Sequence, residues 1–170
     1  MTVTGEALRD LQAPVKARYK TEPGAAMVTL RARGRLGEGV TCSVETGRAL
    51  VAAGLHPATG GDGRSACSGD MLLEALVACA GVTLNAVASA MGIALRDATI
   101  HAEGDLDFRG TLGIDKEAPV GFVEIRLRFD VDTDAAQDKL DLLLKLTERY
   151  CVVYQTIKNG PKVSVEMKRI

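Results

Sequence analysis

The sequence predicts an α+β fold, and three patterns in it support this prediction. Apolar and polar residues alternate along residues 100–108 and 123–131, which is the period of a strand with one buried face. Met71 to Ile93 is a long apolar stretch without that alternation, which is typical of a helix buried on all sides. A second helical pattern begins at Thr133 and Asp134. We therefore expect strands and helices in one domain that spans residues 1–170.

The composition is that of an ordinary globular protein. The chain has 170 residues, of which 46% are hydrophobic and 25% charged, with a net charge of −1. Because acidic and basic residues are well mixed, the sequence predicts neither a nucleic-acid nor a membrane surface. Residues 1–12 carry acidic residues and lack the apolar core of a signal peptide. We expect a cytoplasmic protein whose four cysteines are reactive or buried rather than joined in structural disulfides.

The long apolar stretch predicts a homodimer. Leu76 to Ile93 has no charged residue over 18 positions, which is enough to consider a membrane span. Small and polar residues fill much of it, however, so a helix buried in protein is favoured. A helix from residue 68 or 70 to residue 91 would be about 33–36 Å long, more than one small protomer can cover. We expect an identical subunit to cover it, with Met71 to Met91 at the dimer centre.

The strand predictions begin near the N-terminus. Val15–Thr21 and Met27–Arg35 alternate on either side of Glu22-Pro23-Gly24, which predicts a hairpin. In its second strand, apolar residues face inward and Thr29, Arg31 and Arg33 face outward. The inward-facing residues are Val28, Leu30 and Ala32. Further predicted elements are a strand over 39–45, a loop over 110–119 and a last strand over 162–169.

The second helix should carry a cysteine toward the core. Thr133-Asp134 is expected to open it, with Gln137 as a capping-box partner. Four residues then fall on one stripe of the helix at spacings of three or four. They are Leu140, Leu144, Thr147 and Cys151.

The residues alone leave the role of the cysteines open. Cys79 has apolar neighbours at helical spacing, so it is either a core residue or a nucleophile. Cys151 is similar, although a new helical turn near Gln155 would supply amide dipoles that favour a thiolate. Cys42 and Cys67 are interpreted as background residues. With no Cys-x-x-Cys pair, and with His56 and His101 interpreted as solvated, the sequence predicts neither a metal nor another cofactor.

At this point the chain resembles the OsmC and organic hydroperoxide resistance superfamily. The resemblance rests on Gly60-Gly61-Asp62-Gly63, on the helical segment Met71 to Cys79 and on Cys151-Val152-Val153, and it covers residues 14–169. It implies antiparallel sheets wrapped around long central helices in an intertwined homodimer, with active sites at the subunit interface. It also implies that Cys79 is the peroxidatic thiol, that Cys151 resolves it, and that an external dithiol resets the pair. An apolar surround of Cys79 would suit organic hydroperoxides.

The sequence also departs from the pattern of typical peroxidase members. In these members, a Glu stands ten residues before the first cysteine, and this Glu holds an Arg against the thiolate. This chain has Gly69 at that position, followed by Asp70. Asp70 either substitutes for that Glu or only caps the helix, and Arg64 and Arg48 are the candidate arginines. The usual proline after the second cysteine is Val152. Two hypotheses therefore stand, a thiol peroxidase and a non-catalytic protein that binds a small apolar ligand at the dimer interface.

Overall fold

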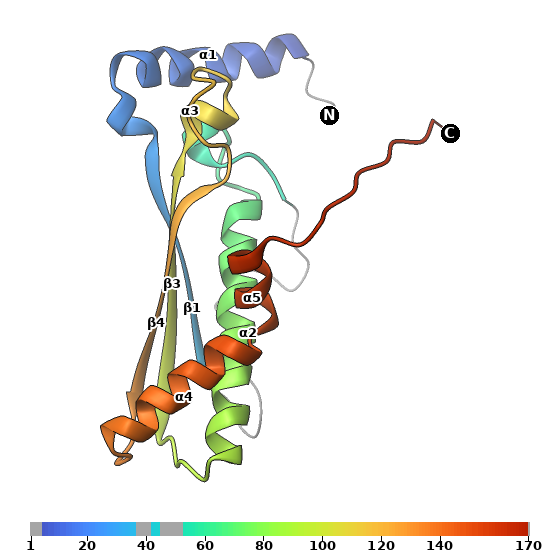
Figure 1. Cartoon of the computed structure of the whole chain (residues 1–170). Coiled ribbons are helices and arrows are strands. Elements are labelled where there is room, and N and C mark those ends of the chain that lie inside the picture. Colours follow the sequence, from blue (N-terminus) through green and yellow to red (C-terminus); the bar gives the residue numbers. More distant parts are fainter. Residues whose placement is uncertain (1–4, 37–41, 45–52, 170) are drawn as a thin grey trace.

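A four-stranded antiparallel sheet forms one layer of the protein. In the computed structural model, residues 5–36, 42–44 and 53–169 are described. The strands are β1 (Met27–Leu36), β2 (Cys42–Val44), β3 (Asp97–Asp107) and β4 (Phe122–Asp132), in the order β2-β1-β3-β4 (Figure 1). The strands predicted over 27–35, 100–108 and 123–131 are thus confirmed. Of the strand predicted over 39–45, residues 42–44 are described, and they form β2.

The alternation along β3 sets one face of the sheet against the core. Ala98, Ile100, Ala102, Gly104 and Leu106 are buried, and the residues that alternate with them are only half-buried. On the other face, Arg126 of β4 pairs with Asp105 of β3. The sheet thus has one dry face, as the sequence predicts.

The first residues of β4 depart from the strict alternation of inward- and outward-facing side chains. Asp105 pairs with Glu124 whereas Leu106 pairs with Phe122, so Val123 is an extra residue between two paired positions. Val123 is 53% exposed instead of facing the core. Phe122 takes the inner position and lies over Gly104, where an added Cβ would be 2.4 Å from the ring.

The long helix α2 (Ser68–Ala90) packs against the dry face of the sheet, as its largely apolar sequence predicts. Leu73, Leu76 and Val77 are among its fully buried residues. By length and composition α2 could also cross a membrane, since its most apolar window has a mean hydropathy of 1.8. Core helices of soluble proteins meet the same criteria, so this is weak evidence for a span.

The strand predicted over Val15–Thr21 is wrong, because these residues end helix α1 (Gly5–Thr21). The same residues fit both periods, since Val15 and Tyr19 are two steps apart on a strand face and one turn apart on a helix. Tyr19 decides between them: it is 3% exposed, and its hydroxyl donates a 2.6 Å hydrogen bond to the Ala58 carbonyl. α1 lies across one end of the sheet (Figure 1), beside the short helices η1 (Pro23–Ala26) and η2 (Pro57–Thr59).

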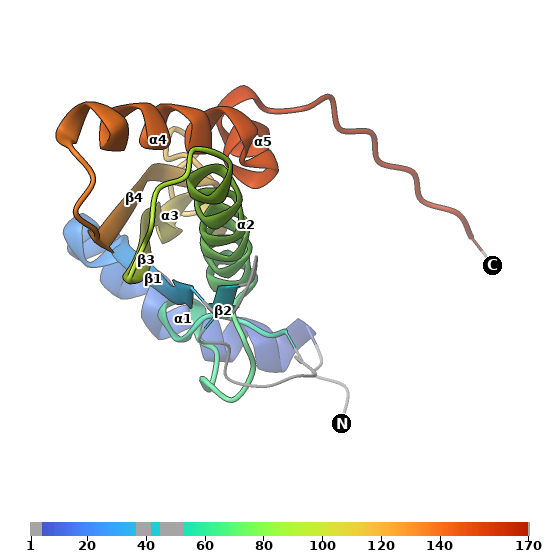
Figure 2. The same ribbon diagram turned by 90° about the horizontal axis from the view of Figure 1, so that it is seen from below.

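Three further helices complete the fold, namely α3 (Phe108–Thr111), α4 (Gln137–Tyr150) and α5 (Val152–Asn159). α3 begins the segment predicted to be only a loop. α4 and α5 lie together beside α2, as the end-on view shows (Figure 2).

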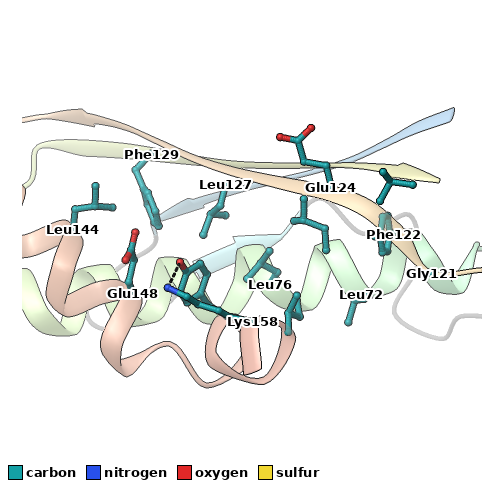
Figure 3. A pocket seen from close by; sticks show the side chains of 14 residues that line it. Leu72, Leu76, Gly121, Phe122, Glu124, Leu127, Phe129, Leu144, Glu148 and Lys158 are labelled. Carbon is teal, nitrogen blue, oxygen red and sulfur yellow. Dashed lines mark hydrogen bonds between the residues drawn. The ribbon is translucent and has the colours of Figure 1, made fainter. Parts of the chain in front are cut away.

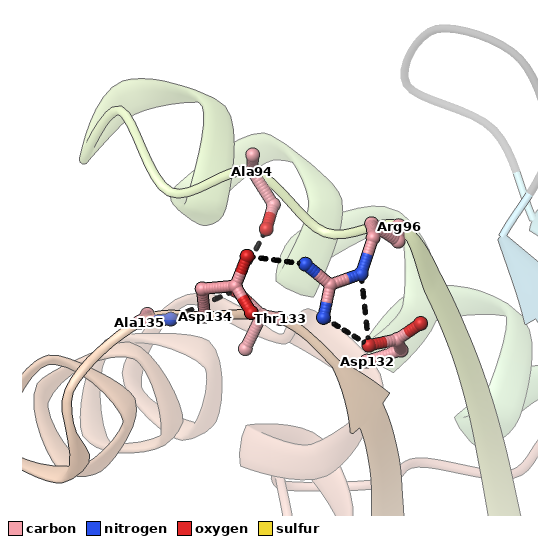
Figure 4. Close-up of polar contacts among 6 residues, drawn as sticks. All are labelled: Ala94, Arg96, Asp132, Thr133, Asp134 and Ala135. Carbon is pink, nitrogen blue, oxygen red and sulfur yellow. Dashed lines mark hydrogen bonds and ion pairs between the residues drawn. The ribbon is translucent and has the colours of Figure 1, made fainter.

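The start of α4 differs from the prediction. It begins at Gln137 rather than at Thr133, and its N-cap, Ala136, offers no side-chain hydrogen bond. Thr133 and Asp134 are engaged elsewhere (Figure 4): the Thr133 hydroxyl donates to the Ala94 carbonyl at 2.7 Å, and Asp134 accepts from Arg96. These residues join the end of β4 to the start of β3, so they are not available as a helix cap.

The stripe predicted on α4 is partly wrong. Thr147 and Cys151 are each 1% exposed, so the second cysteine does point into the core. Leu144, however, is 44% exposed, and Leu143 is buried in its place. The buried stripe is therefore shifted by one residue in the middle of the helix.

The strand predicted over residues 162–169 does not form in this chain. These residues pair with no strand, and all of them are exposed. Val163, Val165 and Met167 are 77%, 93% and 97% exposed, and the segment runs away from the rest of the protein (Figure 1). Its alternating pattern requires a sheet edge, and this segment does not reach one in its own chain.

Candidate functional site

Cys79 and Cys151 meet between α2 and the junction of α4 with α5. Cys79 is half-buried in the middle of α2, whereas Cys151 is buried at the junction, where it is both the C-cap of α4 and the N-cap of α5. The two thiols act on each other, because a hydrogen bond from the Cys151 thiol lowers the pKa of Cys79 and raises that of Cys151. Both thiols are free. The structure thus brings together the two cysteines that the sequence singled out.

The Cys79 sulfur is surrounded by hydrogen-bond donors. Burial pushes the pKa of the Cys79 thiol up, but hydrogen bonds from Val153 N–H, the Cys151 thiol, Val152 N–H and the Thr83 hydroxyl outweigh it. The net result is a pKa below that of an ordinary thiol, because hydrogen bonds to a thiolate stabilise the charged form. Cys79 is therefore the more nucleophilic sulfur of the pair.

Cys151 has the opposite character. Burial raises the pKa of its thiol to about 11, and hydrogen bonds from Tyr154 N–H offset this only in part. Its hydrogen bond to Cys79 raises the pKa further, because the Cys151 proton is held between the two sulfurs. The pair thus combines a half-buried thiol that ionises more readily than an ordinary one with a buried thiol that holds its proton.

The other predicted site residues do not join the two sulfurs within this chain. Asp70 lies nine residues before Cys79 on α2, or about 14 Å along the axis. Burial raises the pKa of its carboxyl group, and nearby His56 offsets this in part. The side chain of Arg64 is 89% exposed and pairs with Asp62 at 3.8 Å. Arg48 lies outside the described residues.

The remaining cysteines and histidines lie away from the pair. Cys67 is the N-cap of α2 and packs at the edge of the core, while the side chain of Cys42 is outside the described part. His56 was predicted to be solvated but is half-buried: it stacks on Phe108 and accepts a hydrogen bond from Ala58 N–H. Among the described residues, no cluster of three or more His, Cys, Asp or Glu side chains could hold a metal ion.

An apolar cavity of about 790 Å³ lies between β4, α2 and the α4–α5 pair (Figure 3). Leu72 and Leu76 of α2 face Leu127 and Phe129 of β4 across it. Lys158 lies beside it with its amine 3.5 Å from the Tyr154 hydroxyl. Neither sulfur is among its lining residues, although Leu76 is one turn before Cys79. The cavity is therefore a neighbour of the thiol pair rather than part of it.

One side of α2 is apolar and uncovered in the single chain. Met71, Ala75, Val82 and Ala86 are exposed, and helical spacing places them along one stripe. At about 100° per residue, Cys79 falls at the border between this stripe and the buried side of the helix. In the single chain, Cys79 therefore borders the uncovered stripe.

Comparison with known proteins identifies the family. A sequence model of the family described as "OsmC-like protein" matches residues 61–166, which is more than half of the chain. The chain belongs to the OsmC-like protein family. No curated protein matches this OsmC-like protein.

Solved structures show the same fold. An OsmC-like hydroperoxide resistance protein from Jannaschia sp. CCS1 superposes with a TM-score of 0.62 at 12% identity, covering 85% of this chain and 95% of that one. An OsmC-like protein from Mycoplasma pneumoniae gives a TM-score of 0.55 at 16% identity, covering 79% and 86%. The mixed arrangement of helices and antiparallel strands in this OsmC-like protein is thus the OsmC-like fold.

Sequence reasoning did not predict the donors around Cys79. Thr83 lies four residues after Cys79, a spacing that places it one turn away on the same side of the helix. That spacing was a usable signal. The amides of Val152 and Val153 gave a weaker one, because they become donors only once α5 is known to begin directly after Cys151.

Proposed function

We propose that this OsmC-like protein reduces organic hydroperoxides through Cys79 and Cys151. The observation that carries the proposal is the pair of free thiols, Cys79 on α2 and Cys151 at the α4–α5 junction beside it, and a lowered pKa at Cys79 with a pKa raised to about 11 at Cys151 supports it. A hydroperoxide resistance protein among the fold relatives supports it further. A half-buried thiol beside an apolar helix stripe suits an alkyl or aryl hydroperoxide better than hydrogen peroxide.

The reaction balances over two steps. The Cys79 thiolate attacks the terminal oxygen of ROOH, the O–O bond breaks, and RO⁻ takes a proton and leaves as ROH, so Cys79 becomes a sulfenic acid. The Cys151 thiol then attacks the Cys79 sulfur, and its proton leaves with the hydroxyl group as water. An external dithiol reduces the resulting disulfide by thiol exchange and supplies the two electrons. No metal or other cofactor is needed for these steps.

Turnover of cumene hydroperoxide with a dithiol reductant tests the proposal. Cys79→Ser should abolish turnover, whereas Cys151→Ser should form one equivalent of sulfenic acid and then stop. If the wild type and Cys79→Ser consume peroxide equally slowly, Cys79 is a core residue. The predicted roles of Asp70, Arg64 and Arg48 in activating the thiol stay predictions, and single Ala variants test them in the same assay.

A second candidate function is the binding of a small apolar ligand without catalysis, and the cavity beside Leu72 and Leu76 favours it. In that case an apolar fluorescent probe should bind the wild type. Leu72→Glu should weaken binding, whereas Val120→Glu in the 65%-exposed loop position should not. Probe binding together with absent peroxide turnover would make this the function.

We infer that the working form is a cytoplasmic homodimer, in which residues 1–170 form a single domain. Two apolar surfaces support the dimer: the exposed stripe of α2, and the extended C-terminal segment with Val163, Val165 and Met167 uncovered. β4 is the end strand of the sheet, so it offers a free edge with which such a segment from a second copy could pair.

A further inference from the structure

We propose that Thr83 and Val152 are two further residues of the Cys79 site, and that the Thr83 O–H and the Val152 N–H hold its thiolate as uncharged donors. The inference rests on the proposed function, because it concerns the same reactive sulfur. The inference goes beyond the proposed function because it names residues that activate the Cys79 thiol, and no sequence motif pointed to these residues.

The position of Thr83 fits this role. It lies one helical turn after Cys79 on the same side of α2, and both residues are half-buried. A threonine hydroxyl in a helix commonly bonds to the carbonyl four residues back, as Thr147 does with the Leu143 carbonyl at 2.8 Å. Thr83 instead stands four residues after a cysteine side chain, and a hydrogen bond from its hydroxyl is one of the causes that lower the pKa of the Cys79 thiol.

Val152 supplies its donor through the backbone. It is the first residue of α5, where amide groups have no partner inside the helix. The first hydrogen bond of α5 runs from Gln155 N–H to the Cys151 carbonyl, which leaves the amides of residues 152–154 unpaired within the helix. Hydrogen bonds from the amides of Val152 and Val153 lower the pKa of the Cys79 thiol, and those from Val153 and Tyr154 oppose the rise in the pKa of Cys151.

Among the described residues, the groups that stabilise the Cys79 thiolate are all uncharged. Of the basic side chains in residues 5–36, 42–44 and 53–169, none is among the groups that act on Cys79. Hydrogen bonds alone are known to lower the pKa of an acid when they favour its charged form. Within this part of the chain, the amides of α5 and the hydroxyl of Thr83 therefore take the place of a cation.

Both donors can be removed with little change of shape. Thr83→Val replaces the hydroxyl by a methyl group, and Thr83→Ser keeps it. Val152→Pro deletes one N–H at the first position of a helix, where proline is well tolerated. The preceding residue, Cys151, has φ −72° and ψ 107°, which is the extended conformation that a residue before proline requires.

The experiment measures how fast iodoacetamide alkylates Cys79 as a function of pH, with the Cys79 peptide quantified by mass spectrometry in the full-length reduced protein. Thr83→Val and Val152→Pro should each raise the apparent pKa by about half a unit to one unit, which slows alkylation near pH 7 about 3- to 10-fold. The double variant should be slower than either. Thr83→Ser should react like the wild type.

Thr133→Val is the matched control, since it removes a threonine hydroxyl that bonds a carbonyl elsewhere in the fold. Its Cys79 should alkylate at the wild-type rate. If Thr83→Val and Val152→Pro also alkylate at the wild-type rate over the whole pH range, the inference is wrong. The proposed function fails separately: a wild type without peroxide turnover, but with the expected alkylation pattern, refutes the peroxidase and leaves the donor assignment intact.

Discussion

At the scale of single residues, the two sulfurs differ because of the amides they meet and how deeply they are buried. Cys79 collects four hydrogen bonds at a half-buried position, so its thiolate is stabilised although burial opposes it. Cys151 is 1% exposed, and its thiol keeps its proton while donating a hydrogen bond that favours ionisation of Cys79. In the proposed reaction, Cys79 would attack the peroxide and Cys151 would stay protonated until the disulfide forms.

This difference predicts the order of modification. The folded Cys79 has a lowered pKa, so its alkylation should rise with pH and level off below the range of an ordinary thiol. Alkylation of Cys151 should keep rising toward its pKa of about 11. Peptide mapping after short iodoacetamide pulses between pH 5 and pH 10 measures both. Earlier labelling of Cys151 than of Cys79 at neutral pH would contradict this assignment.

At the scale of elements, the sequence predicted correctly the helices and strands whose apolar residues repeat with only one period, either that of a strand or that of a helix. β3, β4 and α2 were predicted correctly because their patterns are long, whereas Val15–Thr21 is short enough to fit both periods. The cap of α4 was missed because Thr133 and Asp134 bond to Ala94 and Arg96 across the sheet, which no local pattern reports.

The candidate site, like the fold, could be predicted from the sequence only in part. Cys79 and Cys151 could be found from the motif and its spacing. The donors around them could not, because an N–H becomes available to a sulfur only when a helix starts beside it, and the start of α5 was expected near Gln155 rather than at Val152.

Two glycines, one in α3 and one just before β4, give a test of how tightly the backbone is packed. A Cβ at Gly110 would lie 2.4 Å from the Pro119 carbonyl oxygen, whereas a Cβ at Gly121 would meet nothing within 4 Å. Gly110→Ala should therefore lower the free energy of unfolding by about 1–3 kcal/mol through overpacking. Gly121→Ala should leave it unchanged or raise it by less than about 1 kcal/mol. Urea unfolding of both variants measures the difference, and equal midpoints would show that the backbone around residue 119 yields.

At the scale of the whole molecule, the uncovered stripe of α2 predicts how assembly can be broken. Val82 is 38% exposed in the middle of that stripe, and a carboxylate there would have to be buried in the proposed dimer. Val82→Glu should therefore shift the protein toward monomer in sedimentation velocity at micromolar concentration. Val120→Glu, at an exposed loop position, should sediment like the wild type. A wild type that is a stable monomer would disprove the dimer itself.

The distance along the chain between the two cysteines has a mechanical consequence. Cys79 and Cys151 are separated by 151 − 79 = 72 positions, so their disulfide would tie the middle of α2 to the hinge between α4 and α5. Such a cross-link restricts the unfolded chain and would stabilise the fold by about 4 kcal/mol. The oxidised protein should then melt roughly 10 °C above the reduced one, and Cys79→Ser should show no difference.

Each oxidation of the pair would thus produce a more stable form of the protein, which would persist until the dithiol reduces it. A molecule waiting for its reductant would resist heat and proteases better than one that is ready to react. The ratio of heat-resistant to heat-sensitive protein would then report the balance between oxidation by hydroperoxide and reduction by the dithiol.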